Sequence, residues 1–521
     1  MSRFDQITSE RKRKLDELRK IINPYPYSFD VKHYSELIKD CYKHLKSDER
    51  TKEKAALAGR VLTIRDIGKI IFANVQDGQG KIQVILQKEE TEKQSFELFK
   101  KFIDTGDFIG VHGTIMKTRT GEISVLVKKF ELLSKALLPL PEKWHGLQDD
   151  EERYRKRYLD LIMNPDVKKV FDKRAAILEA IRELLKKKNF TEVETPYLQT
   201  LYGGAAAKPF KTHLNALDIN LFLAVSPELY LKRLIVGGYD KVYTISRNFR
   251  NEGIDRWHNP EFTMMEIYES YKDYNDMMNL FEEIYEYAAK KVNGSNKVEF
   301  RGKTIDFKRP WKRMTMAAAV KKFAEIDIEK MSDKEISQFI KKNHIESKED
   351  NWGWNVQAIF DHFCEDKIEQ PTFIIDHPLV TTPLCKSHRE DKLCRTIERF
   401  EPFCMGAELG NAYSELNDPE VQRRLLEEQQ RMLKKGDEEA NPLDEDFLEA
   451  MEIGMPPTGG LGLGIDRMIM LLTGQDSIKE VILFPFMKPI NAEENKEEKH
   501  GKKDSKKEHD KNETKKDSKK R

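Results

Sequence analysis

Residues 246–269 read SRNFRNEGIDRWHNPEFTMMEIYE, and this stretch decides how the chain is interpreted. Two runs rich in aromatic and apolar residues flank a charged loop, which predicts two strands joined as a hairpin. The first strand ends on Arg250, whose planar guanidinium suits a phosphate or a carboxylate. Alternation along the second strand gives one face to Phe262, Met264, Glu266 and Tyr268. The stretch therefore predicts a site for a nucleotide and a charged amine, with an exposed hairpin as the alternative.

A glycine repeat lies nearer the C-terminus, in residues 456–472, PPTGGLGLGIDRMIMLL. Every second position of the repeat is glycine, namely Gly460, Gly462 and Gly464. Such spacing leaves one face of a strand as bare backbone, on which a flat ligand can lie. We expect an apolar helix to begin near Asp466, with Arg467 in its first turn, where a phosphate would meet positive charge and the helix N-terminus. A dinucleotide-binding turn is the alternative, although the spacing is GxGxG rather than GxGxxG.

Acidic residues recur along a third segment, residues 398–418, ERFEPFCMGAELGNAYSELND. On a regular strand the side chains of Asn411, Tyr413 and Glu415 share one face, and Glu408 points away. A bulge near Gly410 would bring Glu408 to the same face. Carboxylate ligands without Cys or His suit Mg²⁺ rather than zinc. The alternative is a solvated acidic strand. The acids of the segment are Glu401, Glu408, Glu415 and Asp418.

Together these segments resemble the class II lysyl-tRNA synthetases, over residues 1–488. NFTEVETPYL (189–198), with Pro196, resembles motif 1, which lies at the dimer interface of that family. RNFRNEG with HNPEFTMMEIY resembles motif 2, and GGLGLGIDRM resembles motif 3. Lysine-type members are further marked by GGAAAKPF (203–210), VSPELYLKRL (225–234) and NAYSELND (411–418). The resemblance implies an α+β fold: an antiparallel-sheet catalytic domain of the class II synthetases with an N-terminal OB-type β-barrel.

Four parts of the chain follow from composition and from this resemblance. Residues 1–50 form a helical segment with basic faces, and residues 51–140 form the barrel, in which DGQGK and RTGE mark hairpin turns. Residues 150–488 form the catalytic domain, with motif 1 at about 171–198, motif 2 at about 244–268 and motif 3 at about 456–472. Residues 489–521 are a charged tail that we expect to be disordered, with weak attraction to tRNA as the alternative.

The barrel by itself fits two interpretations equally well, one that only packs on a neighbouring domain and one that binds RNA. The resemblance implies the second, because the anticodon-binding domain of the family occupies this position. Phe72 and Gln83 match positions that stack on and read an anticodon base, and Arg65 is a weaker candidate.

Composition restricts the class of protein. The 521 residues include 91 Lys and Arg against 90 Asp and Glu, so the net charge of +1 predicts no polyanion partner. No run approaches the eighteen apolar residues of a membrane span, and MSRFDQITSERKRK lacks the apolar core of a signal peptide. The five cysteines contain no CxxC pair, which favours a reducing cytoplasm.

The resemblance also implies a reaction. Lysine attacks the α-phosphate of ATP in the presence of Mg²⁺, and the lysyl group then moves to the 3′ end of tRNA(Lys) on a homodimeric enzyme. Arg250 and Arg467 are the expected catalytic residues, and Glu401 and Glu408 the expected metal ligands. The expected ATP-binding residues are Arg250, Glu252, His258, Asn259, Phe262, Glu408, Gly464 and Arg467. The expected lysine-binding residues are Gly204, Glu228, Arg250, Glu266, Tyr268, Asn411, Tyr413 and Glu415.

Two positions depart from the family pattern, and two other functions remain open. Trp257 stands where Thr or Arg is frequent, so a phosphate contact is lost or moves to Arg256, and Tyr413 stands where Phe is frequent. An aspartyl or asparaginyl enzyme would share the barrel and the motifs, but those relatives usually carry Gln where Glu228 stands. A tRNA-binding scaffold without catalysis is the second alternative, which the complete set of motif arginines disfavours.

Overall fold

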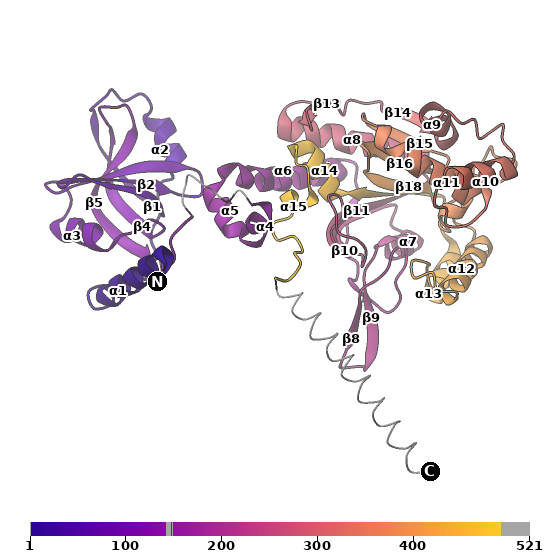
Figure 1. Cartoon of the computed structure of the whole chain (residues 1–521), viewed down its shortest axis with the longest axis horizontal. Coiled ribbons are helices and arrows are strands. Elements are labelled where there is room, and N and C mark those ends of the chain that lie inside the picture. The colour runs from indigo at the N-terminus through magenta and orange to yellow at the C-terminus, as the bar shows by residue number, and fades with distance from the viewer. Residues whose placement is uncertain (1, 142–146, 148, 491–521) are drawn as a thin grey trace, which may run out of the picture. The chain divides into compact units, whose positions relative to one another are not determined.

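The computed structural model describes residues 2–141, 147 and 149–490, and the chain divides into two compact units (Figure 1). The first unit comprises Met1–Gln148 and the second Asp149–Arg521. The charged tail expected at 489–521 lies outside the described residues from position 491 onward.

The first unit is a closed five-stranded barrel with the strand order β1-β2-β3-β5-β4. Alternate residues of each strand point inward, so that in β2 every second side chain is buried. The two hairpin turns expected from DGQGK and RTGE join β2 to β3 and β4 to β5, which confirms the barrel. Its strands are β1 Arg50–Asp66, β2 Ile70–Gln76, β3 Lys81–Gln87, β4 Phe108–Lys117 and β5 Ile123–Ser134, and its helices are α1 Arg3–Leu18, α2 Ser35–Tyr42 and α3 Lys93–Phe102.

The second unit is built on a nine-stranded sheet, in the order β14-β15-β16-β18-β19-β11-β10-β6 with β17 attached to β16. The central pairs are antiparallel, and the outer pairs β14–β15 and β10–β6 are parallel. This arrangement confirms the predicted α+β class. The strands are β6 Thr191–Glu192, β10 Lys241–Phe249, β11 Glu261–Ser270, β14 Lys312–Thr315, β15 Thr372–Ile375, β16 Arg399–Cys404, β17 Ala407–Glu408, β18 Gly410–Ser414 and β19 Thr458–Gly464.

Smaller sheets and the helices complete this unit. The remaining strands are β7 Leu198–Gln199, β8 Lys211–Leu214 and β9 Ile219–Leu223 in one sheet, with β12 Lys297–Phe300 and β13 Lys303–Asp306 in another. The helices are α4 Asp150–Arg155, α5 Arg157–Met163, α6 Pro165–Lys187, α7 Glu228–Val236, α8 Tyr274–Asn293, α9 Met316–Phe323, α10 Asp333–Lys342, α11 Trp352–Phe363, α12 Pro419–Lys434, α13 Glu445–Gly454, α14 Ile465–Thr473 and α15 Ile478–Val481, with short 3₁₀ turns η1 Glu365–Lys367 and η2 Leu379–Thr381.

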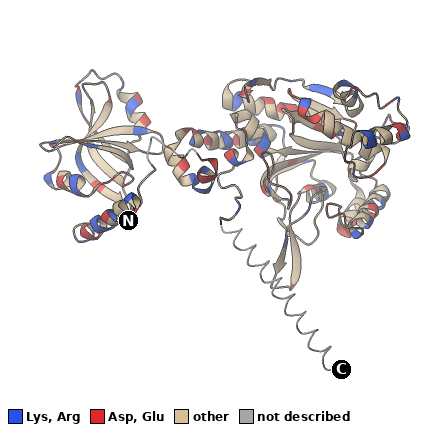
Figure 2. Ribbon diagram, in the orientation of Figure 1, with Lys and Arg blue, Asp and Glu red and all other residues tan. Residues whose placement is uncertain are grey.

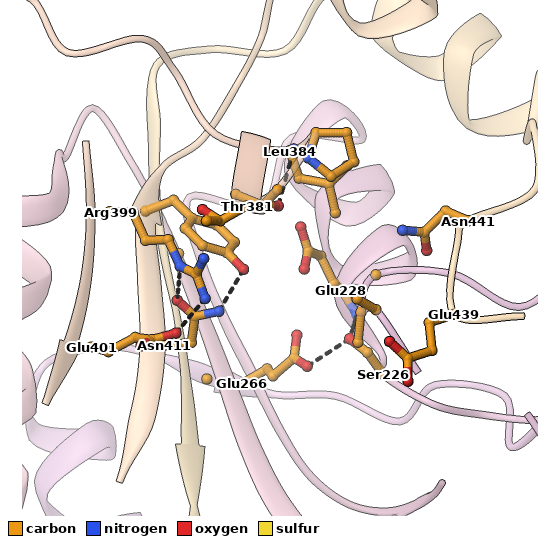
Figure 3. Close-up of a pocket in the computed structure, with 18 of the residues that line it drawn as sticks. Ser226, Glu228, Glu266, Thr381, Leu384, Arg399, Glu401, Asn411, Glu439 and Asn441 are labelled. Carbon is orange, nitrogen blue, oxygen red and sulfur yellow. Dashed lines mark hydrogen bonds and ion pairs between the residues drawn. The ribbon is translucent and has the colours of Figure 1, made fainter. Parts of the chain in front are cut away.

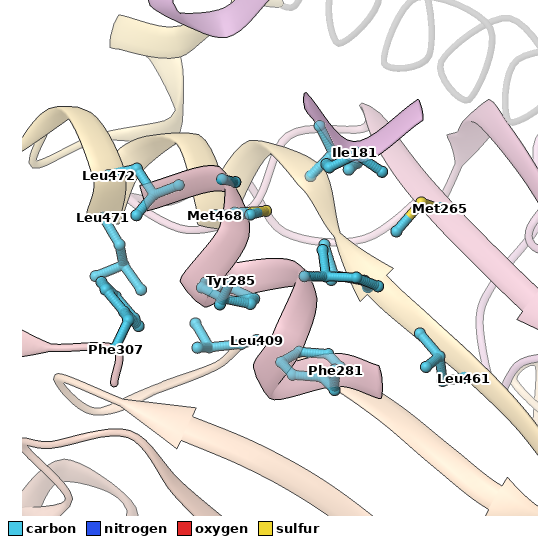
Figure 4. Packing of buried hydrophobic residues seen from close by; sticks show 14 of the residues in the cluster. Ile181, Met265, Phe281, Tyr285, Phe307, Leu409, Leu461, Met468, Leu471 and Leu472 are labelled. Carbon is cyan, nitrogen blue, oxygen red and sulfur yellow. The ribbon is translucent and has the colours of Figure 1, made fainter. Parts of the chain in front are cut away.

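Alternation along β11 and β19 separates the core from the site. Met265 on β11 and Leu461 on β19 face the apolar cluster, where they pack with Phe281 and Tyr285 of α8 and with Met468 of α14 (Figure 4). The residues between them in each strand point to the opposite face of the sheet. Burial of one face therefore fixes the register and directs the polar side chains of these strands to one surface.

The helix of motif 1 begins earlier than its sequence suggests. Motif 1 is expected to start at about residue 171, and its helix α6 runs from Pro165 to Lys187. Proline at the first helical position lacks only an N–H that would have no partner there, so it starts the helix without cost. Asn189 follows with a φ of 64°, the left-handed conformation expected for a residue that ends a helix.

A one-residue irregularity separates β17 from β18. Phe403 of β16 pairs with Glu408, whereas Arg399 pairs with Tyr413, so one extra residue is accommodated between the two pairs. Leu409 occupies the break, and its carbonyl accepts a hydrogen bond from the N–H of Gly464 at 3.0 Å. The bulge that the sequence required near Gly410 is thus present, and Glu408 lines the same cavity as Tyr413.

Charged residues of both signs are interspersed along the helices and strands of both units (Figure 2). This distribution agrees with the near-zero net charge of the whole chain and gives the surface the mixed polarity of a solvated protein.

Candidate active site

Three neighbouring strands form the floor of the candidate site. The glycine strand β19 lies between β11 and β18, and its glycines pair with side-chain-bearing residues on both sides. Gly460 pairs with Tyr268 and with Tyr413, and Gly462 pairs with Glu266 and with Asn411. The rows of polar side chains are therefore separated by bare backbone, which creates a cavity open on one face of the sheet.

Three carboxylates are buried in the first of two adjoining cavities, which we call the acid pocket. Glu228 begins α7, Glu266 lies on β11 and Glu415 directly follows β18, and each is at most 4% exposed. The side chains of Glu228 and Glu266 both point into this pocket (Figure 3). Anionic groups away from water require cationic partners, so the pocket is built to receive positive charge.

Local hydrogen bonds hold two of these groups in place. The Ser226 hydroxyl donates to Oε1 of Glu266 at 2.7 Å, and the Tyr268 hydroxyl donates to Oε2 of the same carboxylate at 3.2 Å. On the opposite wall, the Asn411 amide donates to the hydroxyl of Tyr413 at 2.7 Å. Glu266 is therefore fixed by neutral donors and has no cation among its hydrogen-bond partners in the described part of the chain.

Burial and mutual repulsion raise the pKa values of these carboxyl groups. Burial, followed by the charge of Glu228, raises the pKa of Glu266 to about 8. Burial also raises the pKa of Glu415 to about 8, against the opposing effect of Lys232, and burial raises the pKa of Glu228. Without a bound cation the pocket therefore favours protonated carboxyl groups, and a cationic ligand would displace their protons.

Two glycines let the backbone and the carboxylates approach one another. A Cβ on Gly204, which has a φ of +85°, would come within 2.8 Å of both Glu228 Cβ and Ser226 Oγ. A Cβ on Gly460 would come within 2.0 Å of Oε1 of Glu415. No side chain fits at either position, so both glycines are required by space.

The second cavity adjoins the acid pocket and carries the features of a nucleotide site, so we call it the nucleotide pocket. The guanidinium carbon of Arg250 lies 5.2 Å from the ring centre of Phe262, and the buried Nε of Arg250 has no hydrogen-bond acceptor among the described residues. Arg467 donates to Nε2 of His258 at 2.9 Å. Because arginine can only donate, Nε2 is the accepting nitrogen and the ring proton lies on Nδ1, 2.8 Å from Asp255.

The remaining residues of motif 2 differ in how they contribute to the nucleotide pocket. Glu252 is exposed and lines the nucleotide pocket. The Asn259 amide donates to the backbone carbonyl of Glu261 at 2.6 Å, and its carbonyl oxygen accepts from the N–H of Phe486 at 3.3 Å. The side chain of Asn259 is thus engaged by the backbone, although it lines the pocket. Trp257 lines the pocket as well, whereas Arg256 is exposed and outside the lining.

Glu408 lines both cavities and Glu401 lines the acid pocket, and their donor chemistry fits Mg²⁺. Arg399 pairs with Glu401, and Arg467 lies 3.7 Å from Oε2 of Glu408. Burial, followed by the charge of Glu401, raises the pKa of Glu408, so these carboxylates interact. Within the described ranges no group of three or more His, Cys, Asp or Glu side chains could hold a metal ion. Two carboxylates with phosphate oxygens and water form the usual ligand set of Mg²⁺.

The structure brings the predicted site residues together in these two cavities. Arg250 and Glu408 line both of them. The acid pocket contains every residue expected to bind lysine: Gly204, Glu228, Arg250, Glu266, Tyr268, Asn411, Tyr413 and Glu415. The nucleotide pocket contains every residue expected to bind ATP: Arg250, Glu252, His258, Asn259, Phe262, Glu408, Gly464 and Arg467.

Sequence reasoning missed five residues that line the acid pocket or lie directly beside it. Ser226 precedes Glu228 in the quoted VSPELYLKRL segment, and Lys232 follows Glu228 by one helical turn, a spacing that places both on one face. Arg399 precedes Glu401 by two strand positions and donates to Oδ1 of Asn411 at 3.0 Å. Lys348 and Trp354, from the region between motifs 2 and 3, also line the acid pocket.

The expected anticodon residues lie on neighbouring strands of the barrel. Arg65 of β1 pairs with Phe72 of β2, and its guanidinium carbon lies 4.8 Å from the ring centre. Gln83 of β3 accepts from the Ser124 hydroxyl at 3.1 Å and donates to Glu122 at 3.2 Å. All three side chains are only partly buried or exposed, so they face outward from the barrel.

Comparison with known families agrees with this architecture. The family described as tRNA synthetases class II (D, K and N) matches residues 149–488, and the OB-fold nucleic acid binding domain matches residues 55–133. The chain therefore belongs to the class II tRNA synthetases of this group, and the resemblance inferred from the three motifs is confirmed.

Curated relatives narrow the family further. A lysine–tRNA ligase of Methanoculleus marisnigri is 50% identical over 478 residues, covering 91% of this chain and 94% of the relative. Those of Fervidobacterium nodosum and Clostridium novyi are 48% and 49% identical over 480 and 494 residues, covering 92% and 93% of this chain and 93% and 95% of the relatives. Within the class, the family is that of the lysine–tRNA ligases.

None of the helices in the described part of the chain is long and apolar enough to cross a membrane. All five cysteines are at described positions and are free.

Proposed function

We propose that this protein is a lysine–tRNA ligase, which activates L-lysine with ATP and transfers it to the 3′ end of tRNA(Lys). The observation that carries the proposal is the pair of adjoining cavities that share Arg250 and Glu408. One cavity holds the buried carboxylates of Glu228, Glu266 and Glu415, and the other combines Arg250, Phe262 and Arg467. A diammonium substrate and a nucleotide would therefore meet at the shared residues.

In the first step, a carboxylate oxygen of lysine attacks the α-phosphorus of ATP. A new P–O bond forms, the bond from this phosphorus to the oxygen that bridges to the β-phosphate breaks, and pyrophosphate leaves. Arg250 binds both the lysine carboxylate and the α-phosphate, because its buried Nε has no partner within the described chain. In the second step, a hydroxyl of the terminal ribose attacks the lysyl carbonyl, loses its proton, and AMP leaves. No protein nucleophile takes part, so catalysis depends on positioning and charge.

The nucleotide pocket supplies a stacking surface and positive charge. Adenine stacks on Phe262, with Arg467 on its other side and near the phosphates. Glu252 accepts from the adenine amino group, His258 and Asn259 lie near the phosphates, and Gly464 leaves room beside them. Glu401 and Glu408 hold Mg²⁺, which neutralises phosphate charge when bound.

The acid pocket binds both ammonium groups of lysine. Glu228 and the backbone of Gly204 bind the α-ammonium, while Glu266, Tyr268 and Glu415 surround the ε-ammonium. Asn411 and Tyr413 line the wall between them. An uncharged side chain of the same shape would leave buried carboxylates unpaired, which disfavours it strongly.

The tRNA contacts, the assembly and the compartment complete the proposal. Residues 51–140 bind the anticodon through Phe72 and Gln83, with Arg65 beside them, and residues 150–488 catalyse the reaction. Exposed apolar side chains within motif 1, including Tyr197 at 46% and Leu198 at 54%, support a homodimer. The free cysteines fit the reducing cytoplasm.

Amino-acid-dependent exchange of pyrophosphate into ATP tests the first step. The assay is run with Mg²⁺ and, separately, lysine, aspartate, asparagine and ornithine. Exchange with lysine alone supports the proposed specificity, and exchange with aspartate or asparagine overturns it. Absence of exchange from folded protein would favour the tRNA-binding scaffold. Charging of tRNA(Lys) with labelled lysine then tests the second step.

A further inference from the structure

A lysine of the protein itself lies beside the acid pocket. Lys232 follows Glu228 by one turn of α7, so both side chains lie on the same face of the helix. The Lys232 side chain is fully buried, and its Nζ donates to Oε1 of Glu228 at 2.7 Å. The centre of the Phe447 ring lies 6.0 Å from the same nitrogen.

The same ammonium group reaches a second carboxylate from a distant part of the chain. Lys232 Nζ lies 2.5 Å from Oε2 of Glu415, whose side chain is also fully buried. Lys232 therefore bridges the carboxylate at the proposed α-ammonium end of the pocket and the one at the proposed ε-ammonium end. Burial would lower the pKa of Lys232, but the charges of Glu228 and Glu415 raise it, so the ammonium stays charged.

The bridge uses one oxygen of each carboxylate. Lys232 contacts Oε1 of Glu228 and Oε2 of Glu415. The other oxygen of Glu415, Oε1, is buried and has no hydrogen-bond donor in the described part of the chain. Glu266, held by Ser226 and Tyr268, adds a third carboxylate without a cation. Among these four groups, three carboxylates in their ionised form and one internal ammonium leave two negative charges for a ligand to match.

A purely structural role explains this arrangement poorly. A buried ion pair contributes little to stability compared with well-packed apolar residues, because desolvation offsets the attraction. Here the two carboxylates that Lys232 joins both line the acid pocket. The arrangement serves a ligand that brings two ammonium groups at a defined separation.

We propose that Lys232 is a positioning residue for substrate selection: by bridging Glu228 and Glu415, it sets the spacing and the net charge of the pocket so that a diammonium amino acid of lysine length is accepted. This inference rests on the proposed function. Ornithine is one methylene shorter, so its two ammonium groups cannot reach both Glu228 and Glu415 while Lys232 holds these carboxylates in place. Without the bridge, each carboxylate is free to move toward a shorter substrate.

The test compares wild type with Lys232→Met by pyrophosphate exchange, using lysine and ornithine as substrates. We expect the KM for lysine to rise by about 30-fold or more, because a buried charge loses its partner. The KM for ATP should change by less than about three-fold, and the preference for lysine over ornithine in kcat/KM should fall by about ten-fold or more. A general loss of packing would lower both activities together and leave that preference unchanged.

The controls separate the possible failures. Lys241→Met removes a lysine that pairs with Glu269 at 2.8 Å but lies outside both cavities, and it should leave the kinetic constants unchanged. Thermal unfolding followed by circular dichroism shows whether each variant is folded. If Lys232→Met does not fold, Lys232→Gln, which keeps N–H donors but no charge, replaces it.

Two outcomes contradict the inference while leaving the proposed function intact. One is a folded variant with wild-type KM for lysine, and the other is a variant that loses lysine and ornithine activity by the same factor. Failure of the wild type itself to exchange pyrophosphate with lysine would instead overturn the proposed function.

Discussion

Oε1 of Glu415 lies so close to Gly460 that a Cβ on this glycine would approach it to 2.0 Å. The glycine strand therefore does more than leave space for a ligand, because it lets a buried carboxylate rest against the backbone. Gly462, two positions further along the same face, is less constrained, since its Cβ would come no closer than 3.4 Å to Met264. This difference provides a matched pair of variants.

Gly460→Ala should raise the KM for lysine by about 30-fold or more, because the displaced Glu415 carboxylate can no longer meet an ammonium group. Gly462→Ala should have the smaller effect. Pyrophosphate exchange and thermal unfolding of both variants measure this difference. Equal effects of the two substitutions would show that the contact with Glu415 is not the reason for glycine at position 460.

Glu415→Gln should weaken lysine binding far more than ATP binding. The amide keeps the shape of the side chain but removes the charge that an ε-ammonium requires, so we expect the KM for lysine to rise by about 100-fold. Glu445→Gln, at an exposed glutamate that pairs with Arg423, is the control. Equal losses of lysine and ATP affinity would contradict the assigned role of Glu415.

Lysine binding should depend on pH with a defined sign. Since the pKa values of Glu266 and Glu415 are raised to about 8 in the empty pocket, both groups carry protons at pH 7. The ε-ammonium needs ionised carboxylates, so binding should strengthen as pH rises from 6.5 to 8.5 and should release protons at pH 7. Isothermal titration in buffers of different ionisation enthalpy measures this release. Binding without proton release would place these pKa values below 7.

Glu401→Gln should raise the Mg²⁺ concentration needed for half-maximal exchange by about ten-fold, because one of two hard oxygen ligands loses its charge. The KM for lysine should stay within about three-fold of wild type, since Glu401 is not expected to contact an ammonium group. Chelation of Mg²⁺ should abolish exchange in both proteins. An unchanged Mg²⁺ requirement would remove Glu401 from the metal site.

The barrel offers a matched pair for the anticodon contact. Phe72→Ala should raise the KM for tRNA(Lys) by about ten-fold or more, because stacking on a base contributes to binding. Pyrophosphate exchange should not change. Phe108, which also packs under an arginine, with Arg60 4.2 Å from its ring centre, is the control position. If Phe108→Ala impairs charging as much as Phe72→Ala, the effect belongs to barrel stability rather than to tRNA contact.

Much of the fold and of the candidate site could be predicted from local pattern. Strand alternation correctly grouped Glu266 with Tyr268, and it placed Gly460 with Gly462 on one face. Glu408 and Tyr413 are separated by an odd number of positions, so both can face the site only if the strand contains a bulge. The structure contains this bulge. Such predictions succeed because the direction of a side chain along a strand is fixed by backbone geometry alone.

Other features depend on contacts between segments far apart in the sequence. The spacing of Glu228 and Lys232 on α7 is visible in the sequence, but the contact of Lys232 with Glu415 is not. The sequence also does not show that backbone groups hydrogen-bond with the side chain of Asn259.

The sequence by itself determined the family and the identities of the residues that line the two cavities, because motif spacing and strand periodicity are local properties. Only the tertiary structure decided that three carboxylates would share one buried pocket, that their pKa values would rise, and that Lys232 would join two of them. Burial and charge interaction depend on what packs around a group in three dimensions, and no local pattern contains that information.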